Sequence, residues 1–370
     1  MASALPVALG HAKESLLQNV ALRSGWEIAK PTTVGLLITY RCQMRCKQCD
    51  IWTWSDRRDE LSTEQWKAIL RDLRRWLGPC HVQFGGGEPF LRQDLVELFS
   101  YASSLGIVPG TTTNAIAISS AKTRELMDCG LFNMNVSMDA IQPDKYEYLR
   151  GVPGAFGKLM STIEELKARQ RESNSRLRII VKTTIMGYNL DQIVPLLDWV
   201  EQQGLLGIRL QLLDQNLGEE RDPHWYQKSD LWVKEPAALD AVIDAILERK
   251  GRGAPVLNTE AYLHLARQYY RDPSSIGIVG GRCAVGWSAF NVNANGDVQL
   301  CYDMPSIGNL TRSTAAEIWH SPQARERRAQ IARCRQSCIQ LCRVQRSLAE
   351  NVELFCRLVG IKGKGGKGAA

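Results

Sequence analysis

Three cysteines follow the first predicted strand at spacings that suit a soft metal centre. Cys42, Cys46 and Cys49 lie within eight residues of one another. Thiolates favour zinc, copper(I) or an iron–sulfur cluster. Structural zinc takes four protein ligands, and no fourth Cys or His is near in sequence, although His81 at the end of the next strand could complete a zinc site. In a 4Fe–4S cluster, three cysteines would leave one iron open to a small-molecule ligand.

A second cysteine group lies towards the C-terminus. Cys283 and Cys301 flank an alternating apolar and polar segment around Asn295-Gly296, which predicts a β-hairpin with a type I′ turn. The hairpin can bring these two cysteines towards one metal centre. A tight run of three more cysteines follows at Cys334, Cys338 and Cys342.

The other three of the eleven cysteines are isolated. Cys80 and Cys129 are expected to be buried small hydrophobic residues, and Cys356 lies in the apolar stretch VELFCRLV, which is more typical of a core. The first residues lack a charged n-region, so we expect no secretory signal, and no apolar run reaches about 18 residues. We therefore expect a cytoplasmic protein, in which clustered cysteines bind metal rather than form disulfides.

The elements that must position the first cysteine group alternate between strands and helices. Nearly continuous apolar runs predict six parallel strands buried on both faces, at 34–39, 81–84, 107–113, 132–138, 177–185 and 207–213. Helices are predicted at 62–77, 93–105, 119–129, 190–203, 236–249, 259–270 and 314–330. Six β/α units favour a barrel or a doubly wound sheet, and six is fewer than the eight of a closed barrel. In either fold the loop with the first cysteines lies at the carboxyl edge, where active sites are built.

This arrangement resembles the radical S-adenosylmethionine (SAM) superfamily. The pattern CX3CX2C occupies the first β–α loop, and Gly86-Gly87-Glu88 ends the second strand. The resemblance implies an α/β fold with a partial (β/α)6 barrel. It also implies a 4Fe–4S cluster on the three cysteines, with SAM on the open iron. One electron from the cluster then cleaves SAM, and the resulting 5′-deoxyadenosyl radical abstracts hydrogen from a substrate.

The same resemblance implies roles for residues at the strand ends. Glu88 would supply a carboxylate for the SAM ammonium, and the glycines before it would let the backbone approach the ligand. Polar contacts to SAM would come from Asn114, Ser137, Asp139 and Lys182. Strand-end turns and helix caps are the alternative for the first three of these. Gln48 departs from the family pattern, in which an aromatic residue commonly precedes the last cysteine.

The second cysteine group resembles the SPASM and twitch extensions of radical SAM enzymes. Cys283, Gly296 and Cys301 match the opening CX9–15GX4C, and the resemblance implies at least one auxiliary 4Fe–4S cluster. We expect ligands from Cys283, Cys301 and two of Cys334, Cys338 and Cys342, with the last two favoured. Two clusters, using Cys334 and Cys356, and a structural zinc knuckle are the alternatives.

The composition bounds the remaining possibilities. The chain of 370 residues is 44% hydrophobic and 23% charged, which is typical of a globular protein. Its net charge of +7 is concentrated from Arg312 onward, where twelve Lys and Arg face four Asp and Glu. We expect part of this region to be a disordered basic tail. Arginines at 325, 327, 328, 333, 335 and 343 could stabilise a cluster or dock an acidic flavodoxin- or ferredoxin-type electron donor.

These features divide the chain into five predicted segments. They are a helical lead (1–32), the barrel (33–250), a helical linker (251–280), an auxiliary cluster domain of α+β type with a β-hairpin and helices (281–356) and a basic tail (357–370). A domain boundary is expected at Gly280-Gly281.

We therefore expect a radical SAM enzyme that acts on an unactivated C–H bond. About thirty residues precede the first strand, too few for a leader-recognition domain, which favours a small-molecule substrate over a peptide presented by a separate protein. Asp214, Glu219, Glu220, Asp222 and His224 could line the barrel mouth, and a solvated acidic loop is the alternative. A non-catalytic iron–sulfur or zinc protein that binds an acidic partner or nucleic acid is the competing class. Nucleic acid is disfavoured because the basic residues lack interleaved aromatics.

Overall fold

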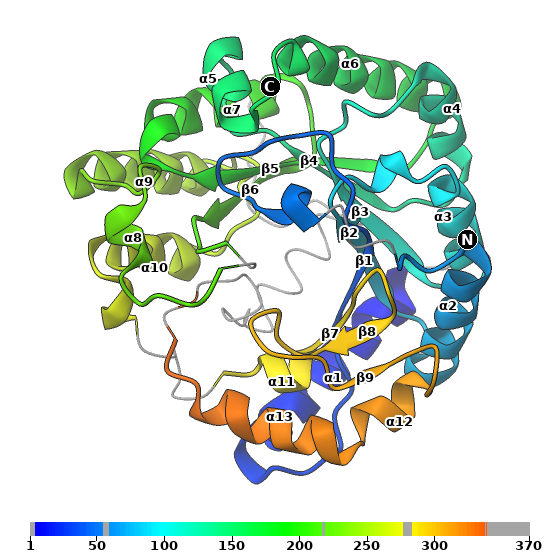
Figure 1. The fold of residues 1–370 in the computed structure, drawn as a ribbon. Helices are drawn as coiled ribbons and strands as arrows, with labels where there is room; N and C mark the ends of the chain where they lie inside the picture. Colours follow the sequence, from blue (N-terminus) through cyan, green and yellow to red (C-terminus); the bar gives the residue numbers. More distant parts are fainter. Residues whose placement is uncertain (1–3, 55–58, 217–218, 277–282, 337, 339–370) are drawn as a thin grey trace.

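One sheet organises the molecule. The computed structural model describes residues 4–54, 59–216, 219–276, 283–336 and 338. Its nine strands are ordered β6-β5-β4-β3-β2-β1-β7-β8-β9. The first six are parallel neighbours. They are β1 Thr33–Thr39, β2 His81–Gly86, β3 Val108–Thr113, β4 Asn133–Ser137, β5 Arg178–Ile185 and β6 Gly207–Leu212. Figure 1 shows them curving around a central space with helices outside, so the predicted partial barrel is confirmed.

The helices form the outer layer of this barrel (Figure 1). Between the strands lie α2 Thr63–Leu77, α3 Leu95–Ser104, α4 Ser120–Asp128, α5 Pro143–Arg150, α6 Ala155–Ser173 and α7 Leu190–Gln202. α1 Ala4–Ser24 precedes them, and α8 Trp225–Lys228, α9 Pro236–Gly251 and α10 Glu260–Arg271 follow. Four short 3-10 helices lie at Ile51–Trp54, Pro89–Leu91, Gly187–Asn189 and Pro273–Ser275. α5 and α6 lie where no helix was predicted from the sequence.

The barrel strands bury apolar residues outward and present polar residues inward. On β4, Met134 and Val136 belong to the hydrophobic core, whereas Ser137 lines the central cavity. Successive side chains of a strand alternate between faces, so Asn133 and Asn135 share the inward face with Ser137. This polar interior leaves room for ligands where a closed barrel would be packed with apolar side chains.

The C-terminal extension continues the same sheet. β7 Ala289–Val292 pairs parallel to β1, and β8 Asp297–Gln299 and β9 Gly308–Asn309 follow antiparallel. The predicted hairpin is confirmed, but its type I′ turn is wrong. Gly296 has a positive φ of 89° and Asn295 does not. The Asn295 side chain instead accepts a hydrogen bond from Asp297 N at 3.2 Å, an Asx-type turn that needs no left-handed Asn.

The prediction of one continuous helix over 314–330 is wrong. Two helices stand there, α12 Ala315–Trp319 and α13 Pro322–Arg333, after the single turn α11 Val285–Ser288. Ser321 caps α13 through Ala324 N, and Pro322 occupies its first turn. Proline at that position starts a helix and cannot continue one, which explains the break. The predicted boundary at Gly280-Gly281 and the basic tail lie outside the described residues.

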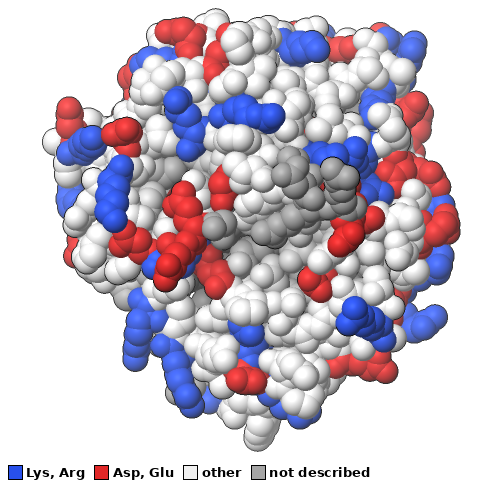
Figure 2. All heavy atoms as spheres, viewed as in Figure 1, with Lys and Arg blue, Asp and Glu red and all other residues white. Residues whose placement is uncertain are grey.

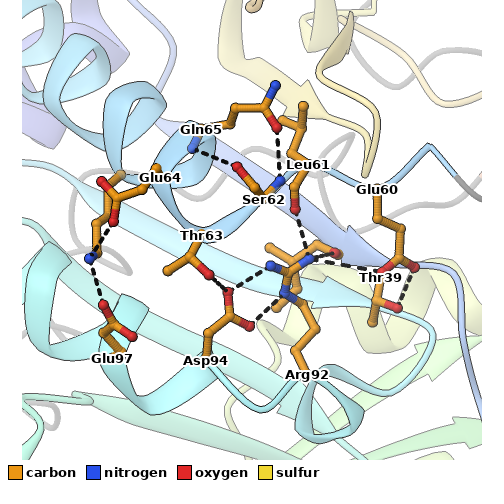
Figure 3. A network of polar contacts seen from close by, with 12 residues as sticks. Thr39, Glu60, Leu61, Ser62, Thr63, Glu64, Gln65, Arg92, Asp94 and Glu97 are labelled. Carbon is orange, nitrogen blue, oxygen red and sulfur yellow. Dashed lines mark hydrogen bonds and ion pairs between the residues drawn. The ribbon is translucent and has the colours of Figure 1, made fainter.

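A buried arginine ties the end of β1 to the start of α2 (Figure 3). Arg92 donates from Nη1 to the carbonyls of Ile38 (3.2 Å) and Leu61 (3.1 Å) and forms a two-point ion pair with Asp94. Asp94 also accepts from Thr63 Oγ1 at 2.6 Å. Beside it, Ser62 and Gln65 form a capping box at the start of α2. The network anchors the point at which the chain leaves β1.

Replacing this arginine should unfold the chain more readily. Arg92→Met leaves two carbonyls without this donor and a largely buried carboxylate without its ion pair, so we expect the free energy of unfolding to fall by about 3 kcal/mol. The control is Arg252→Met, which removes an exposed pair with Glu248 on α9 and should cost about 0.5 kcal/mol or less. Urea unfolding of the metal-free chain measures both. Equal stabilities of the two variants would refute this role.

Candidate active site

One cavity of about 640 Å³ opens at the carboxyl edge of the barrel strands. Both cysteine groups line it, through Cys42, Cys46, Cys49, Cys283, Cys301, Cys334 and Cys338. The predicted SAM-contacting residues that line it are Gly86, Gly87, Asn114, Ser137, Asp139 and Lys182. Cys342 and Cys356 lie outside the described residues. The structure thus brings together residues from sequence segments about 240 positions apart, from Cys42 to Cys283.

Backbone contacts hold the first cysteine loop against the end of β2. Gly87 N donates to Thr39 O, and Glu88 N donates to Arg41 O, each at 2.8 Å. A Cβ on Gly86 would overlap Thr39 O, and one on Gly87 would overlap Arg41 O, whereas a Cβ on Gly85 would meet nothing within 4 Å. The last two glycines of the motif therefore permit a close approach of two backbones.

The other side of the loop is fastened to α5. Arg45 N donates to Arg150 O at 3.0 Å, and Lys47 N donates to Leu149 O at 2.9 Å. The loop is therefore held from two sides, and its three thiols project into the cavity between these attachments.

The thiols suit a cationic cluster. Burial raises the pKa of Cys42 to about 12 and that of Cys49 to about 11, so a thiolate there requires a bound cation. Arg150 Nη1 donates to Cys46 Sγ at 3.6 Å, a hydrogen bond that stabilises sulfur carrying negative charge. No three Cys, His, Asp or Glu side chains of the described chain converge on a point where a single metal ion would bind. Three thiols from one loop, one of them with an arginine donor, have the donor chemistry that an iron–sulfur cluster needs.

Glu88 lies beneath the cavity. Its fully buried carboxylate accepts hydrogen bonds from Thr113 Oγ1 (2.7 Å), Asn114 N (2.8 Å) and Phe90 N (3.1 Å). Burial raises its pKa to about 7 despite these donors. Glu88 is not among the cavity-lining residues, so its visible task is to position Asn114. The Asn114 amide nitrogen in turn lies 4.0 Å from Cys42 Sγ.

Asp139 anchors a buried ion pair that the sequence did not reveal. Its carboxylate accepts from Arg150 Nη2 (2.7 Å), Gln48 Nε2 (2.8 Å) and Thr184 N (3.0 Å). Gln48, the position that departs from the family pattern, thereby ties the cysteine loop to the end of β4. Sequence reasoning missed Arg150 altogether. The only available signal was a basic residue shortly after Asp139, and spacing across a loop does not predict an ion pair.

Lys182 points into the cavity, a direction that its spacing alone could not give. It stands in register between Ser137 on β4 and Arg209 on β6. Its side-chain ammonium has no hydrogen bond or ion pair with a described residue. Burial and the neighbouring Arg209 lower the pKa of Lys182 to about 8. A cation so placed favours an anionic ligand group.

Two of the residues that line the cavity are aspartates joined by one arginine. Arg221 Nη1 lies 3.2 Å from Asp214 Oδ1, and its Nε lies 3.1 Å from Asp303 Oδ1. Asp214 Oδ2 is buried and has no hydrogen-bond partner among the described residues. Of the acidic loop predicted after the sixth strand, Asp214 lines the cavity, whereas Asp222 pairs with Lys228 instead.

Two predictions from isolated residues need correction. His81 begins β2 at the amino edge, pairs with Asn133 Oδ1 at 3.0 Å and does not line the cavity, so it cannot complete a zinc site with the first cysteines. Cys129 is buried as expected, whereas Cys80 is only partly buried against the core.

An incomplete parallel barrel with three thiols at its mouth defines a class of iron–sulfur enzyme, and comparisons with known proteins identify the family. Residues 36–200 match the radical SAM superfamily, and residues 283–344 match the SPASM iron-sulfur cluster-binding domain. These matches support a radical SAM enzyme with a SPASM-type C-terminal domain. The alternative of a non-catalytic metal protein is therefore wrong.

Relatives and solved structures agree with this assignment. The chain is 26% identical over 304 residues to a PqqA peptide cyclase of Bradyrhizobium diazoefficiens, covering 80% of this chain and 74% of that protein. The fold is similar to Streptococcus suis SuiB bound to S-adenosylmethionine (TM-score 0.61, 18% identity, 81% of this chain and 68% of that one). SuiB bound to its precursor peptide SuiA is equally similar (TM-score 0.61, 16% identity, 85% and 70%).

The family supplies the cofactors. A 4Fe–4S cluster and SAM belong to the radical SAM domain, and auxiliary iron–sulfur binding belongs to the SPASM domain. Within the described part of the chain, no helix has the length and hydrophobicity to cross a bilayer.

The glycine contacts predict which motif positions tolerate a methyl group. Gly87→Ala should push the first cysteine loop away from β2, lower the free energy of unfolding by about 1–3 kcal/mol and reduce iron retained after reconstitution. Gly85→Ala is the matched control and should keep wild-type stability and iron, because open space surrounds that position. Urea unfolding and iron analysis read both effects. Iron loading that is equal in the two variants would contradict this account of the motif.

Proposed function

We propose that this enzyme cleaves SAM reductively at a 4Fe–4S cluster held by Cys42, Cys46 and Cys49 and abstracts hydrogen from a C–H bond of a peptide. The observation that carries the proposal is the convergence of these thiols, the strand-end polar residues and the second cysteine group on one cavity. When bound, the cluster and SAM would supply the 5′-deoxyadenosyl radical.

The chain's own residues would orient SAM at this edge. Gly86 and Gly87 offer backbone groups, Asn114 and Ser137 offer side-chain contacts, and Lys182 offers a cation for the SAM carboxylate. Glu88 remains our candidate for binding the SAM ammonium. Because its carboxylate accepts a hydrogen bond from Asn114 N, its hydrogen bonds favour a role in which Glu88 positions Asn114. Asp139 would act by holding Arg150 and Gln48 in place.

The second cysteine group supports one auxiliary 4Fe–4S cluster. Four described cysteines, Cys283, Cys301, Cys334 and Cys338, line the cavity and equal the ligand number of such a cluster. Cys342 lies outside the described residues and remains a predicted ligand.

A peptide substrate replaces the small molecule that the sequence favoured. The relatives are named peptide cyclases, and a structural neighbour is bound to a precursor peptide. Asp214 Oδ2, which has no hydrogen-bond partner in the described part of the chain, offers an acceptor on the cavity wall, which suits the N–H donors of a peptide. The small-molecule expectation rested on the short segment before the first strand, and that argument leaves open a peptide delivered by a separate protein.

Anaerobic reconstitution tests the chemistry. We expect about eight irons per chain for one SAM cluster and one auxiliary cluster, and about twelve if two auxiliary clusters form. SAM and dithionite should then yield 5′-deoxyadenosine. Replacing Cys42, Cys46 and Cys49 together by Ala should abolish this product and spare the auxiliary iron. A chain that binds zinc and forms no 5′-deoxyadenosine would refute the proposal.

Asp214 provides a test of the peptide. With a synthetic precursor peptide encoded beside this chain's gene, Asp214→Asn should lower the yield of modified peptide per SAM cleaved about fivefold or more, because a substrate hydrogen bond is lost. Asp222→Asn, in the same loop but paired with Lys228, is the control and should keep the wild-type ratio. Mass spectrometry of the peptide and chromatography of 5′-deoxyadenosine give the two quantities. A ratio unchanged by Asp214→Asn would exclude it from substrate binding.

A further inference from the structure

The first cysteine loop presents two cations to solvent on either side of a predicted ligand. Arg45 and Lys47 are exposed and flank Cys46, whose thiol faces the cavity. Figure 2, viewed into the barrel mouth, shows Lys and Arg above the centre, over α5 and the loop after β1, and Asp and Glu gathered on the left near α8. The surface of the loop is thus electrically distinct from the acidic side of the mouth.

Aromatic rings support both cations. The Arg45 guanidinium lies 4.9 Å from the centre of the Trp52 ring, and the Lys47 ammonium lies 4.3 Å from that of Tyr148. Tyr148 stacks on Tyr188 with ring centres 4.4 Å apart and an interplanar angle of 27°. These five residues form what we call the loop patch. Tyr148 and Tyr188 are 47% and 39% exposed, so the patch offers flat apolar area as well as charge.

The loop patch is held in a fixed arrangement. Arg45 Nη1 donates to Cys42 O (3.0 Å) and Met44 O (2.9 Å), and the backbone amides of Arg45 and Lys47 are bonded to α5. A partner that binds there would therefore lose little conformational entropy in ordering these side chains.

The two cations are not neutralised locally. Nearby Arg41 is paired with Glu60 at 3.4 Å, and Lys145 with Asp191 at 2.5 Å. Among the described residues, no carboxylate lies within ion-pair distance of Arg45 or Lys47. Two uncompensated positive charges beside exposed tyrosines favour an acidic protein surface, through steering and through aromatic contact.

Two of the C-terminal arginines that the sequence offered as a docking site, Arg325 and Arg328, are engaged elsewhere. Arg328 is buried and donates to Gly286 O (3.1 Å) and Trp319 O (2.8 Å). Arg325 and Arg328 share Glu27. These two side chains fasten α13 to the rest of the molecule. Arg333 and Arg335 are exposed beside Cys334, but no aromatic ring of the described residues supports them as Trp52 and Tyr148 support the loop patch.

We propose that the loop patch docks an acidic one-electron carrier protein of the flavodoxin class. This inference rests on the proposed function, because reductive SAM cleavage needs one electron from outside the chain. The carrier gives up one electron to the enzyme and no atom is transferred. Docking at Arg45 and Lys47 would bring the carrier to the two residues adjacent to Cys46, so the electron would cross a single loop.

Binding and rate measurements together test the docking. The binding readout is the dissociation constant of oxidised flavodoxin, measured by calorimetry with both the metal-free and the reconstituted protein. The rate readout is 5′-deoxyadenosine formed with reduced flavodoxin divided by that formed with dithionite. Lys47→Glu and the double variant Lys47→Glu with Arg45→Glu are compared with a control of equal charge change, Lys158→Glu with Arg312→Glu, at exposed sites on α6 and before α12.

We expect the double variant to weaken flavodoxin binding and lower the rate ratio about tenfold at low salt, with a smaller loss for Lys47→Glu. Added salt should weaken wild-type binding and so narrow the difference. Wild-type values in the double variant, or an equal loss in the control, would overturn the loop patch as the docking site. Absence of 5′-deoxyadenosine with dithionite in the wild type would instead refute the proposed function.

Discussion

The site depends on a contact between two backbones. At the carboxyl edge, the turn after β2 passes so close to the end of β1 that a methyl group at Gly86 or Gly87 would overlap a carbonyl oxygen. The amides of Gly87 and Glu88 donate to Thr39 and Arg41, which fixes where the cysteine loop starts. The Arg92 network supports the same point from below. Because the start of the loop is fixed, its thiols can face the cavity without bonds to one another.

The far end of the loop depends on buried charge. Asp139 holds Arg150, and Arg150 reaches Cys46 Sγ, so β4, α5 and the cysteine loop share one ion pair. A buried ion pair with additional hydrogen bonds specifies geometry more than it adds stability, because desolvation offsets much of its attraction. The same helix supplies Tyr148 to the exposed surface of the loop. α5 therefore contributes to the cavity through Arg150 and to the outer surface of the cysteine loop through Tyr148.

The fold was largely predictable because its signals are local. The six barrel strands were predicted to within one or two residues of their ends, since buried parallel strands need continuous apolar runs. The hairpin was found but not its turn, because Asn295 uses its side chain instead of a left-handed backbone. The helix after residue 314 was not recognised as two, although Pro322 marks the start of the second. α5 and α6 were missed, and with them Arg150.

By itself, the sequence determined the chemistry: three thiols after the first strand, glycines after the second, and a second cysteine group, each recognisable from spacing along the chain. Only the tertiary structure decided how side chains that are distant in sequence meet. It placed Glu88 beneath the cavity, turned Lys182 inward, paired Asp139 with Arg150 and joined Asp214 to Asp303 through Arg221. The physical reason is that spacing encodes which strand end a residue occupies, whereas the direction of its side chain and its partners follow from sheet curvature and packing of the whole molecule.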